Sequence, residues 1–152
     1  MLNDTVKVGS GKMKGDVKVT LLYEDGHTEE VFRENLIMRT GKTLLSKLLA
    51  GPGATTEYIS KMGFGTGNAV TADTQTSLAA QVLTEAATAS FPAYNSVMFT
   101  AVMGVSDGGT SVYQELALLT NTTSIMLSRV VIPPITKSAL FSIQVQWTIS
   151  FQ

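Results

Sequence analysis

The last twelve residues, 141–152, alternate strictly between apolar and neutral polar side chains. The apolar positions are Phe141, Ile143, Val145, Trp147, Ile149 and Phe151, and every residue between them is Ser, Gln or Thr. Successive side chains of a β-strand point to opposite faces of a sheet, whereas helical side chains repeat every 3.6 residues. The pattern therefore predicts a long strand with one core face and one neutral polar face.

Earlier segments carry shorter strand patterns. Residues 16–34 are predicted to form a β-hairpin, and its turn at 24–27 contains an Asp-Gly pair that suits a positive φ angle. Residues 58–64 have the composition of a buried strand. Residues 97–103 are apolar at odd and even positions, which indicates a strand covered on both sides, inside the domain or in an assembly.

A second hairpin is expected from residues 113–119 and 125–132. Pro133 and Pro134 are predicted to end it, because proline has no backbone N–H to donate to a sheet. Roughly seven to nine short strands with regular turns indicate a mainly β protein, a β-sandwich or jelly-roll-like domain. The chain has 152 residues, the size of a single domain, so we expect one β-rich domain over 1–152 with 1–15 as a possible N-terminal arm.

One short α-helix is predicted over about residues 40–50, with Thr40 as its N-cap and Gly51 at its end. The leucines that fall on one face at helical spacing are Leu44, Leu45, Leu48 and Leu49. Further along, Asp73 is expected to cap a short helical turn that runs to Ala80.

Two glycine-containing strings look like nucleotide-binding loops but lack the required spacing. Gly41-Lys42-Thr43 has Leu36 where a phosphate loop needs its first glycine. Gly63-Phe64-Gly65-Thr66-Gly67 has Asn68 where a dinucleotide loop needs its third. The glycines of the second string are better explained by a tight turn or by close backbone packing, and we expect no cofactor.

The composition leaves few options for catalysis. The chain has no cysteine, and His27 at the predicted turn is the single histidine. These facts exclude disulfides, thiolate catalysis, sulfur-bound zinc and multi-histidine metal sites. We also expect no catalytic triad, because the one imidazole available for it is placed at a turn. A carboxylate pair, as in glycosidases, is the least implausible enzymatic site, and its candidates are Asp73, Glu85, Asp107 and Glu115. We expect no enzyme activity and no metal site.

The formal net charge is −1, from 11 Lys and Arg against 12 Asp and Glu, which does not favour nucleic-acid binding. The sequence contains no apolar run of about 18 residues, so no membrane span is expected. The opening Met1-Leu2-Asn3-Asp4 lacks the basic start and apolar stretch of a secretory signal. We therefore expect synthesis in a cytoplasm.

Charge is distributed unevenly along the chain. Residues 1–61 hold nine of the cations and eight of the acids, which leaves two cations and four acids for residues 62–152. A freely solvated surface carries roughly 25–35% charged residues, and the cores of protein interfaces are depleted in charge. We expect residues 62–152 to form most contacts with neighbouring subunits. A solvated surface rich in Ser, Thr, Gln and Asn is the alternative.

The candidate contact residues come from the two strands whose patterns point to a partner. Met98 and Val102 lie on one side of the doubly apolar strand at 97–103, and Gln144 and Gln146 lie on the polar side of the last strand. These four side chains are our predicted assembly contacts.

Three segments then follow one another in a recognisable order. The first is residues 35–51, NLIMRTGKTLLSKLLAG. The second is residues 62–67, MGFGTG, followed by a Thr/Ala/Asp loop and Thr76-Ser77-Leu78. The third comprises residues 114–118, 126–130 and 133–137, and the strand around Trp147 follows it. Together these segments, which span about residues 30–152, resemble small structural proteins of tailed bacteriophages.

The resemblance implies a β-rich building block without enzymatic activity that is repeated around a symmetric particle. Its partners would be further copies of itself and other virion proteins, and it would be made in the host cytoplasm and reside in the virion. We favour a place in the tail, collar or baseplate, with a head-decoration protein as the alternative. A carbohydrate-binding module for host recognition is a further alternative, which needs an exposed aromatic platform. The candidates for that platform are Tyr94, Tyr113 and Trp147, although Trp147 fits the core face of its strand.

Overall fold

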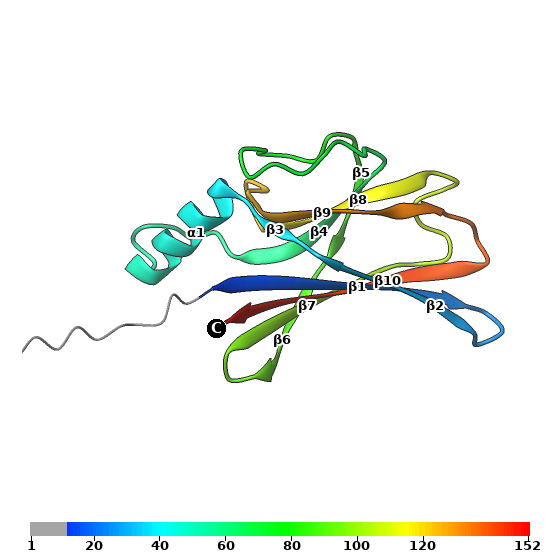
Figure 1. Cartoon of the computed structure of the whole chain (residues 1–152), viewed down its shortest axis with the longest axis horizontal. Helices are drawn as coiled ribbons and strands as arrows, with labels where there is room; N and C mark the ends of the chain where they lie inside the picture. Colours follow the sequence, from blue (N-terminus) through cyan, green and yellow to red (C-terminus); the bar gives the residue numbers. More distant parts are fainter. Residues whose placement is uncertain (1–11) are drawn as a thin grey trace, which may run out of the picture.

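The computed structural model describes residues 12–152, which form ten strands and one helix. The elements are β1 (Met13–Tyr23), β2 (Thr28–Glu34), β3 (Leu36–Ile37), α1 (Arg39–Ala50), β4 (Ile59–Gly65), β5 (Gln81–Ala86), β6 (Thr88–Ala93), β7 (Ser96–Met103), β8 (Val112–Thr120), β9 (Met126–Thr136) and β10 (Phe141–Phe151). Figure 1 shows them in order along the chain. No helix among these residues is long and apolar enough to cross a membrane.

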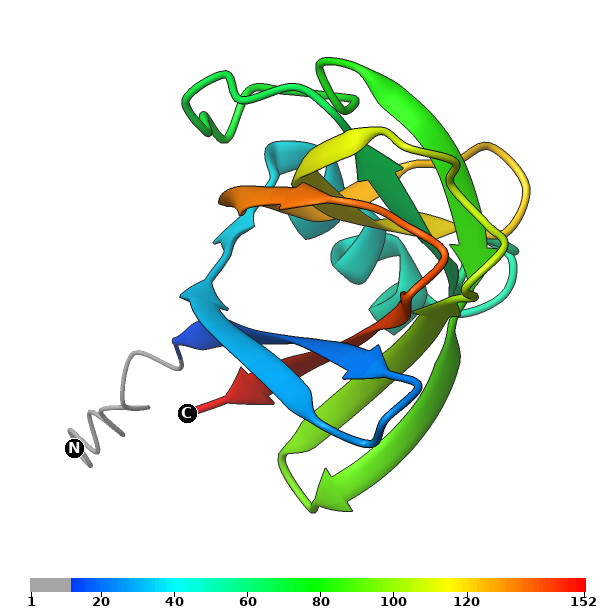
Figure 2. The same ribbon diagram turned by 90° about the vertical axis from the view of Figure 1, so that its right-hand side faces the viewer.

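The strands form two antiparallel sheets of five strands each, which confirms the predicted mainly β fold with one short helix. Sheet A has the order β2-β1-β10-β7-β6, and sheet B has the order β3-β9-β8-β4-β5. The sheets face one another as a sandwich (Figure 2). On one side β5 and β6, which are separated by Ala87 alone, pass from sheet B to sheet A. On the other side β2 and β3 connect the sheets through Asn35.

The core lies between the sheets and contains the odd-numbered side of β10 from Phe141 to Ile149, whereas Phe151 at the end of the strand is 50% exposed. Trp147 and Val145 have no exposed surface, as the alternation predicts. In sheet A, Trp147 lies between Val17 of β1 and Phe99 of β7. Phe64 of sheet B belongs to the same buried cluster. Burial of apolar side chains of this size contributes about 1.5–3 kcal/mol each before entropic costs, so the face of β10 that the sequence predicts anchors the sandwich.

The hairpin predicted at 16–34 is confirmed, but it begins earlier. β1 starts at Met13, so residues 13–15 belong to sheet A rather than to an arm. The rest of the predicted arm, residues 1–11, lies outside the described residues. The turn is where the Asp-Gly pair predicts it, and Gly26 has a φ of 88°, which explains why glycine stands there.

The prediction that Pro133 and Pro134 end a strand is wrong. β9 continues through both prolines to Thr136. Its pairing with β8 shifts register at this point, because Glu115 faces Val131 whereas Tyr113 faces Ile135. The irregularity places the prolines where no regular ladder bond is needed from their nitrogens.

The helix is confirmed in place but not in its details. α1 begins at Arg39, its N-cap is Met38 without a side-chain hydrogen bond, and Thr40 is therefore not the cap. The Thr40 hydroxyl instead donates to the backbone oxygen of Met126 at 2.7 Å. The helix ends before Gly51, as predicted, and the Gly51 N–H donates to Leu48.

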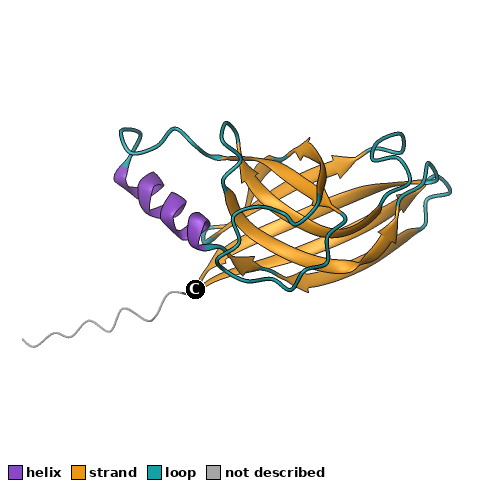
Figure 3. Ribbon diagram, turned by 90° about the horizontal axis from the view of Figure 1, so that it is seen from above, coloured by secondary structure: helices purple, strands orange, loops and turns teal. Residues whose placement is uncertain are grey.

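The four helix leucines do not share one buried face. Leu44 is buried, whereas Leu48 is 41% and Leu49 is 90% exposed. The reason is the position of α1, which lies at one end of the sandwich and extends beyond it (Figure 3). The helical turn predicted after Asp73 is also absent, because residues 66–80 form a loop in the described structure. The Asp73 carboxylate does not cap a helix and instead accepts a hydrogen bond from the Arg39 side chain.

Candidate functional site

The outer face of sheet A, which points away from the core, is formed by even-numbered residues of its strands. The registers place Phe32, Lys18, Gln146, Thr100 and Thr88 side by side across β2, β1, β10, β7 and β6. Because each strand alternates, this single row determines which side chains share the face.

One half of this face carries no ionisable side chain. We call it the neutral half, and it consists of Thr88 and Ser90 of β6, Ser96, Met98, Thr100 and Val102 of β7, and Ser142, Gln144, Gln146, Thr148 and Ser150 of β10. All four predicted assembly contacts lie here. Gln144 faces Val102 directly, and Met98 faces Thr148 one row beyond Gln146. The structure thus brings the four residues onto one surface, and their contact with another subunit stays a prediction.

The strand pattern at 97–103 is explained only in part by the fold of one copy. Phe99, Ala101 and Met103 are buried against the core, but Val102 on the other side is 46% exposed. The other even-numbered residues of β7 are half-buried, so Val102 is the most open position of this side. An apolar side chain at this position is consistent with either a partner or a solvated surface.

The other half of the outer face is charged. This charged half consists of Lys14, Asp16, Lys18 and Leu22 of β1 with Glu30, Phe32 and Glu34 of β2. Lys14 Nζ lies 3.0 Å from Asp16 and 3.1 Å from Glu34, and Lys18 Nζ lies 2.6 Å from Glu30. Hydrogen bonds to Asp16 and Glu34 raise the pKa of Lys14. These pairs are largely open to solvent, so each adds little to stability.

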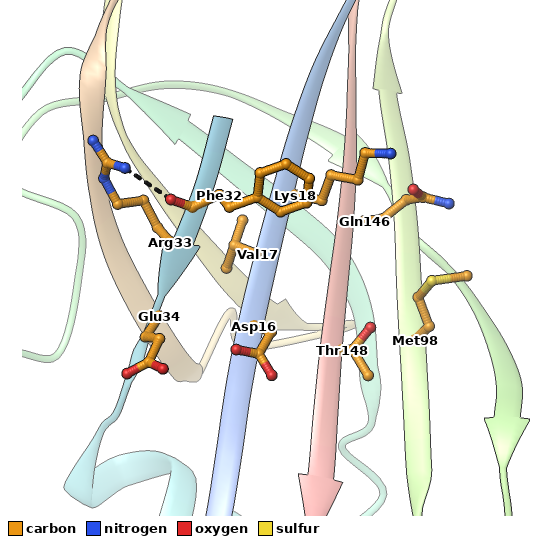
Figure 4. Close-up of a pocket in the computed structure, with 9 residues that line it drawn as sticks. All are labelled: Asp16, Val17, Lys18, Phe32, Arg33, Glu34, Met98, Gln146 and Thr148. Carbon is orange, nitrogen blue, oxygen red and sulfur yellow. Dashed lines mark hydrogen bonds between the residues drawn. The ribbon is translucent and has the colours of Figure 1, made fainter. Parts of the chain in front are cut away.

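A groove of about 460 Å³ lies where the two halves meet. Figure 4 shows its side chains on four adjacent strands, with Phe32 and Lys18 on one side and Met98, Gln146 and Thr148 on the other. Phe32 is 61% exposed, and the Lys18 ammonium lies 5.7 Å from its ring centroid. Phe32 was not among the residues predicted from the sequence to form a site. The pattern that could have indicated it is an aromatic residue at an even position of β2, between Glu30 and Glu34.

The aromatic platform of a carbohydrate module is not assembled from the three predicted residues. Trp147 and Tyr113 have no exposed surface, and the Tyr113 hydroxyl donates to the backbone oxygen of Gly108 at 3.0 Å. Tyr94 is fully exposed at the turn between β6 and β7. Phe91, on β6, is 79% exposed. The prediction that Tyr113 is available to a ligand is therefore wrong.

A buried ionic cluster holds the long loop of sheet B. The Glu115 carboxylate accepts hydrogen bonds from the backbone amides of Gly67, Ala79 and Ala80, at 3.2, 3.1 and 2.7 Å. The Arg129 guanidinium donates two more, at 3.0 and 2.8 Å. Both side chains are fully buried, so this carboxylate has no free surface for a substrate.

Arg129 extends the cluster to the far side of the same loop. Its Nη1 donates to the backbone oxygen of Ala69, the hydroxyl of Thr71 and the amide oxygen of Gln75. Two strands thus hold the loop at 66–80 through one ion pair. A loop of this length without a helix or strand needs such anchors to be ordered.

Burial by itself raises the pKa of Glu115, but the hydrogen bonds from Ala80, Arg129 and Ala79 outweigh it and leave the pKa below its ordinary value. The carboxylate is therefore ionised at neutral pH, which suits a structural ion pair. A general acid would instead need a raised pKa that keeps its carboxyl group protonated. Gly65 and Gly67 lie against it so closely that a Cβ on either would meet a Glu115 oxygen, which confirms the prediction of close backbone packing.

Two of the three remaining candidate acids take structural positions. Asp73 pairs with Arg39 at 3.1 Å, and Asp107 accepts the backbone N–H of Gly104 at 3.0 Å. Glu85 on β5 is half-buried, and burial together with the nearby charge of Asp107 raises its pKa. His27 lies at an exposed turn beside Asp25, as predicted. Within residues 12–152 no group of three His, Cys, Asp or Glu side chains is arranged to hold a metal ion.

Three of the segments that carry the phage resemblance lie at this cluster, whereas residues 35–51 form β3 and α1 and the strand around Trp147 belongs to sheet A. Residues 62–67 lie on β4 and at the start of the loop, residues 114–118 lie on β8, and residues 126–130 lie on β9. Comparisons of the chain with protein-family models, with curated proteins and with solved structures found no match.

Proposed function

We propose that this chain is a non-enzymatic structural protein of a tailed-bacteriophage virion, which assembles as repeated subunits in the tail, collar or baseplate. The observation that carries the proposal is the neutral half of sheet A. It is an outer surface without one ionisable side chain, and it adjoins a half of the same sheet that is rich in them.

This contrast favours a contact surface over a solvated one. Exposed sheet faces usually carry charges that keep proteins apart, whereas interface cores are poor in charge. Ser, Thr and Gln side chains on β10 can exchange water for hydrogen bonds to a partner, and Met98 and Val102 supply apolar contact. The charged half would then face solvent or a second virion protein.

The phage resemblance supports the same proposal from a different part of the molecule. Three of its segments, residues 62–67, 114–118 and 126–130, lie in sheet B around Glu115 and Arg129, where they support a buried anchor for the 66–80 loop. This anchor holds the loop of sheet B in place and does not involve the outer face of sheet A. A head-decoration protein would use the same features. A carbohydrate-binding module is less favoured, because Tyr94 alone of its three candidates is exposed.

Gold labelling of phage particles from the source tests the proposal. The antibody is raised against the hairpin turn at 24–27, which is exposed and lies away from the neutral half. We expect gold at the tail, with pre-immune serum as the control. Gold on the head shell would contradict the tail placement and support the decoration alternative. Protein present in infected cells but not on particles would contradict a virion role.

A further inference from the structure

The edge strand β6 lacks a partner on one side. All six residues from Thr88 to Ala93 are exposed, and β6 pairs only with β7 among the described strands. In an antiparallel sheet, every second residue of an edge strand directs its N–H and C=O groups away from the neighbouring strand. Such an edge can bind another strand through its backbone.

The β6 edge carries none of the charges that usually prevent such pairing. Residues 86–106 contain no Asp, Glu, Lys, Arg or His. Phe91 and Tyr94 add exposed aromatic surface beside the edge, at 79% and 102%. Pro92 and a register shift between Ser90 and Ala93 limit the regular part of the edge to its beginning. A short but unprotected segment around Thr88–Ser90 therefore remains available.

The opposite edge of the same sheet is built differently. β2 carries Glu29, Glu30, Arg33 and Glu34, three acids and one cation in seven residues. Two copies joined through β2 would place two acidic strands, each with more acids than cations, beside one another, and their net repulsion disfavours the pair. Two copies joined through β6 would bring no charges together. Charge therefore selects β6 as the edge that is complementary to itself.

We propose that β6 pairs antiparallel with β6 of a second copy of this chain, so that sheet A continues across a two-fold axis. A two-fold interface brings the same patch of both copies together, and an uncharged strand satisfies that condition without repulsion. The neutral halves of the two copies then form one continuous surface, with Phe91 and Tyr94 near the junction. This inference goes beyond the virion role, because the pairing is a property of the purified protein.

A cysteine scan tests the pairing, since the chain has no cysteine of its own. The full-length variants are Thr88→Cys, Ala89→Cys, Ser90→Cys and Phe91→Cys, all at exposed positions. In an antiparallel two-fold pair one residue faces its own copy at a Cα separation of about 4.5–5.5 Å, which suits a disulfide. The matched controls are Thr28→Cys and Glu29→Cys on the exposed edge β2. Emission from Trp147, the one tryptophan, verifies the fold of every variant.

We expect one β6 variant to form disulfide dimers at least about tenfold faster than its neighbours and than both β2 controls, and the unmodified protein to form dimers in sedimentation equilibrium. Equal rates for β6 and β2, or a protein that stays monomeric, would overturn the proposal. If a mixture of Val6→Cys with a β6 variant instead cross-links faster than the β6 variant alone, the β6 edge is assigned to the N-terminal segment of the chain. That result would also overturn the proposal. None of these results bears on gold labelling, so the two proposals fail separately.

Discussion

Charged side chains are used differently on the two sides of residue 62. Among residues 12–61, they lie on the surface, many in exposed pairs, and Glu57 alone is buried. Among residues 62–152, Glu115 and Arg129 are fully buried and Lys137 is 1% exposed. The surface charges of this second region are therefore Asp73, Glu85 and Asp107. Its surface is poorer in charge than the sequence count indicates.

The difference separates two uses of charge. On β1 and β2, charges keep a sheet face solvated, and their pairing energies are screened by water and salt. In the second region, buried charges hold loops. Glu115 and Arg129 hold residues 66–80, and Lys137 Nζ donates to the backbone oxygens of Val105 and Ser138. Burial lowers the pKa of Lys137, as expected for a cation removed from water.

The largest effect is expected from Arg129→Met. The variant leaves the Glu115 carboxylate buried without its cation, so the free energy of unfolding should fall by about 3–5 kcal/mol. The matched control is Lys18→Met, which removes an exposed pair and should cost below about 1 kcal/mol. Urea unfolding followed by Trp147 emission measures both. Similar losses of unfolding free energy for the two variants would contradict the distinction between buried charges in the second region and solvated charges in the first.

Glu57 is the exception in the first region and should behave like the buried charges of the second. Hydrogen bonds from the Thr120 hydroxyl and from the Thr122 and Thr123 amides lower its pKa below the ordinary value of 4.5. Its contribution to stability should therefore be complete above pH 4.5 and be lost as the pH falls through the lower, folded-state pKa.

Glu57→Gln measures this contribution. The difference in unfolding free energy between wild type and Glu57→Gln should shrink as the pH is lowered from about 6 to about 3. The effect should be smaller than that of Arg129→Met. Glu24→Gln, at the exposed hairpin turn, makes the same change in net charge as a control. A difference that stays constant with pH would mean that Glu57 has no special role.

The smallest effect is expected from exchanging the members of an exposed pair. Lys18→Glu combined with Glu30→Lys keeps opposite charges at the same two positions, which lie diagonally across β1 and β2 on the charged half. The free energy of unfolding should change by less than about 0.5 kcal/mol, because solvent screens the pair in either orientation. A larger loss in thermal or urea unfolding would show that Lys18 or its contact with Phe32 is structural.

The strands were predictable because alternation is a local property of the sequence. β10 and the hairpin of β1 and β2 follow directly from period-two patterns and an Asp-Gly turn. The errors arose where tertiary context overrides local preference. β9 continues through Pro133 because a register shift removes the need for its N–H, and Leu49 is exposed because α1 extends beyond the sandwich.

The candidate surface was predictable strand by strand but not as a surface. The even side of β10 is visibly neutral, and so is that of β7, but nothing local says that the two strands are neighbours. The Glu115–Arg129 cluster was missed for a similar reason, because the pair forms only in the register of β8 and β9. Its signal in the sequence was an isolated charge within each of two apolar strands.

The central claim is that the neutral half of sheet A is a protein contact surface, and sedimentation velocity over a concentration series tests it most directly. The variant is Gln144→Lys with Gln146→Glu, in which the new glutamate faces Lys18, and Trp147 emission checks that the fold is preserved. The control is the Lys18 and Glu30 exchange on the charged half. We predict self-association of the wild type, unchanged association of the control and association at least about tenfold weaker for the variant. Equal association of all three proteins would contradict the claim.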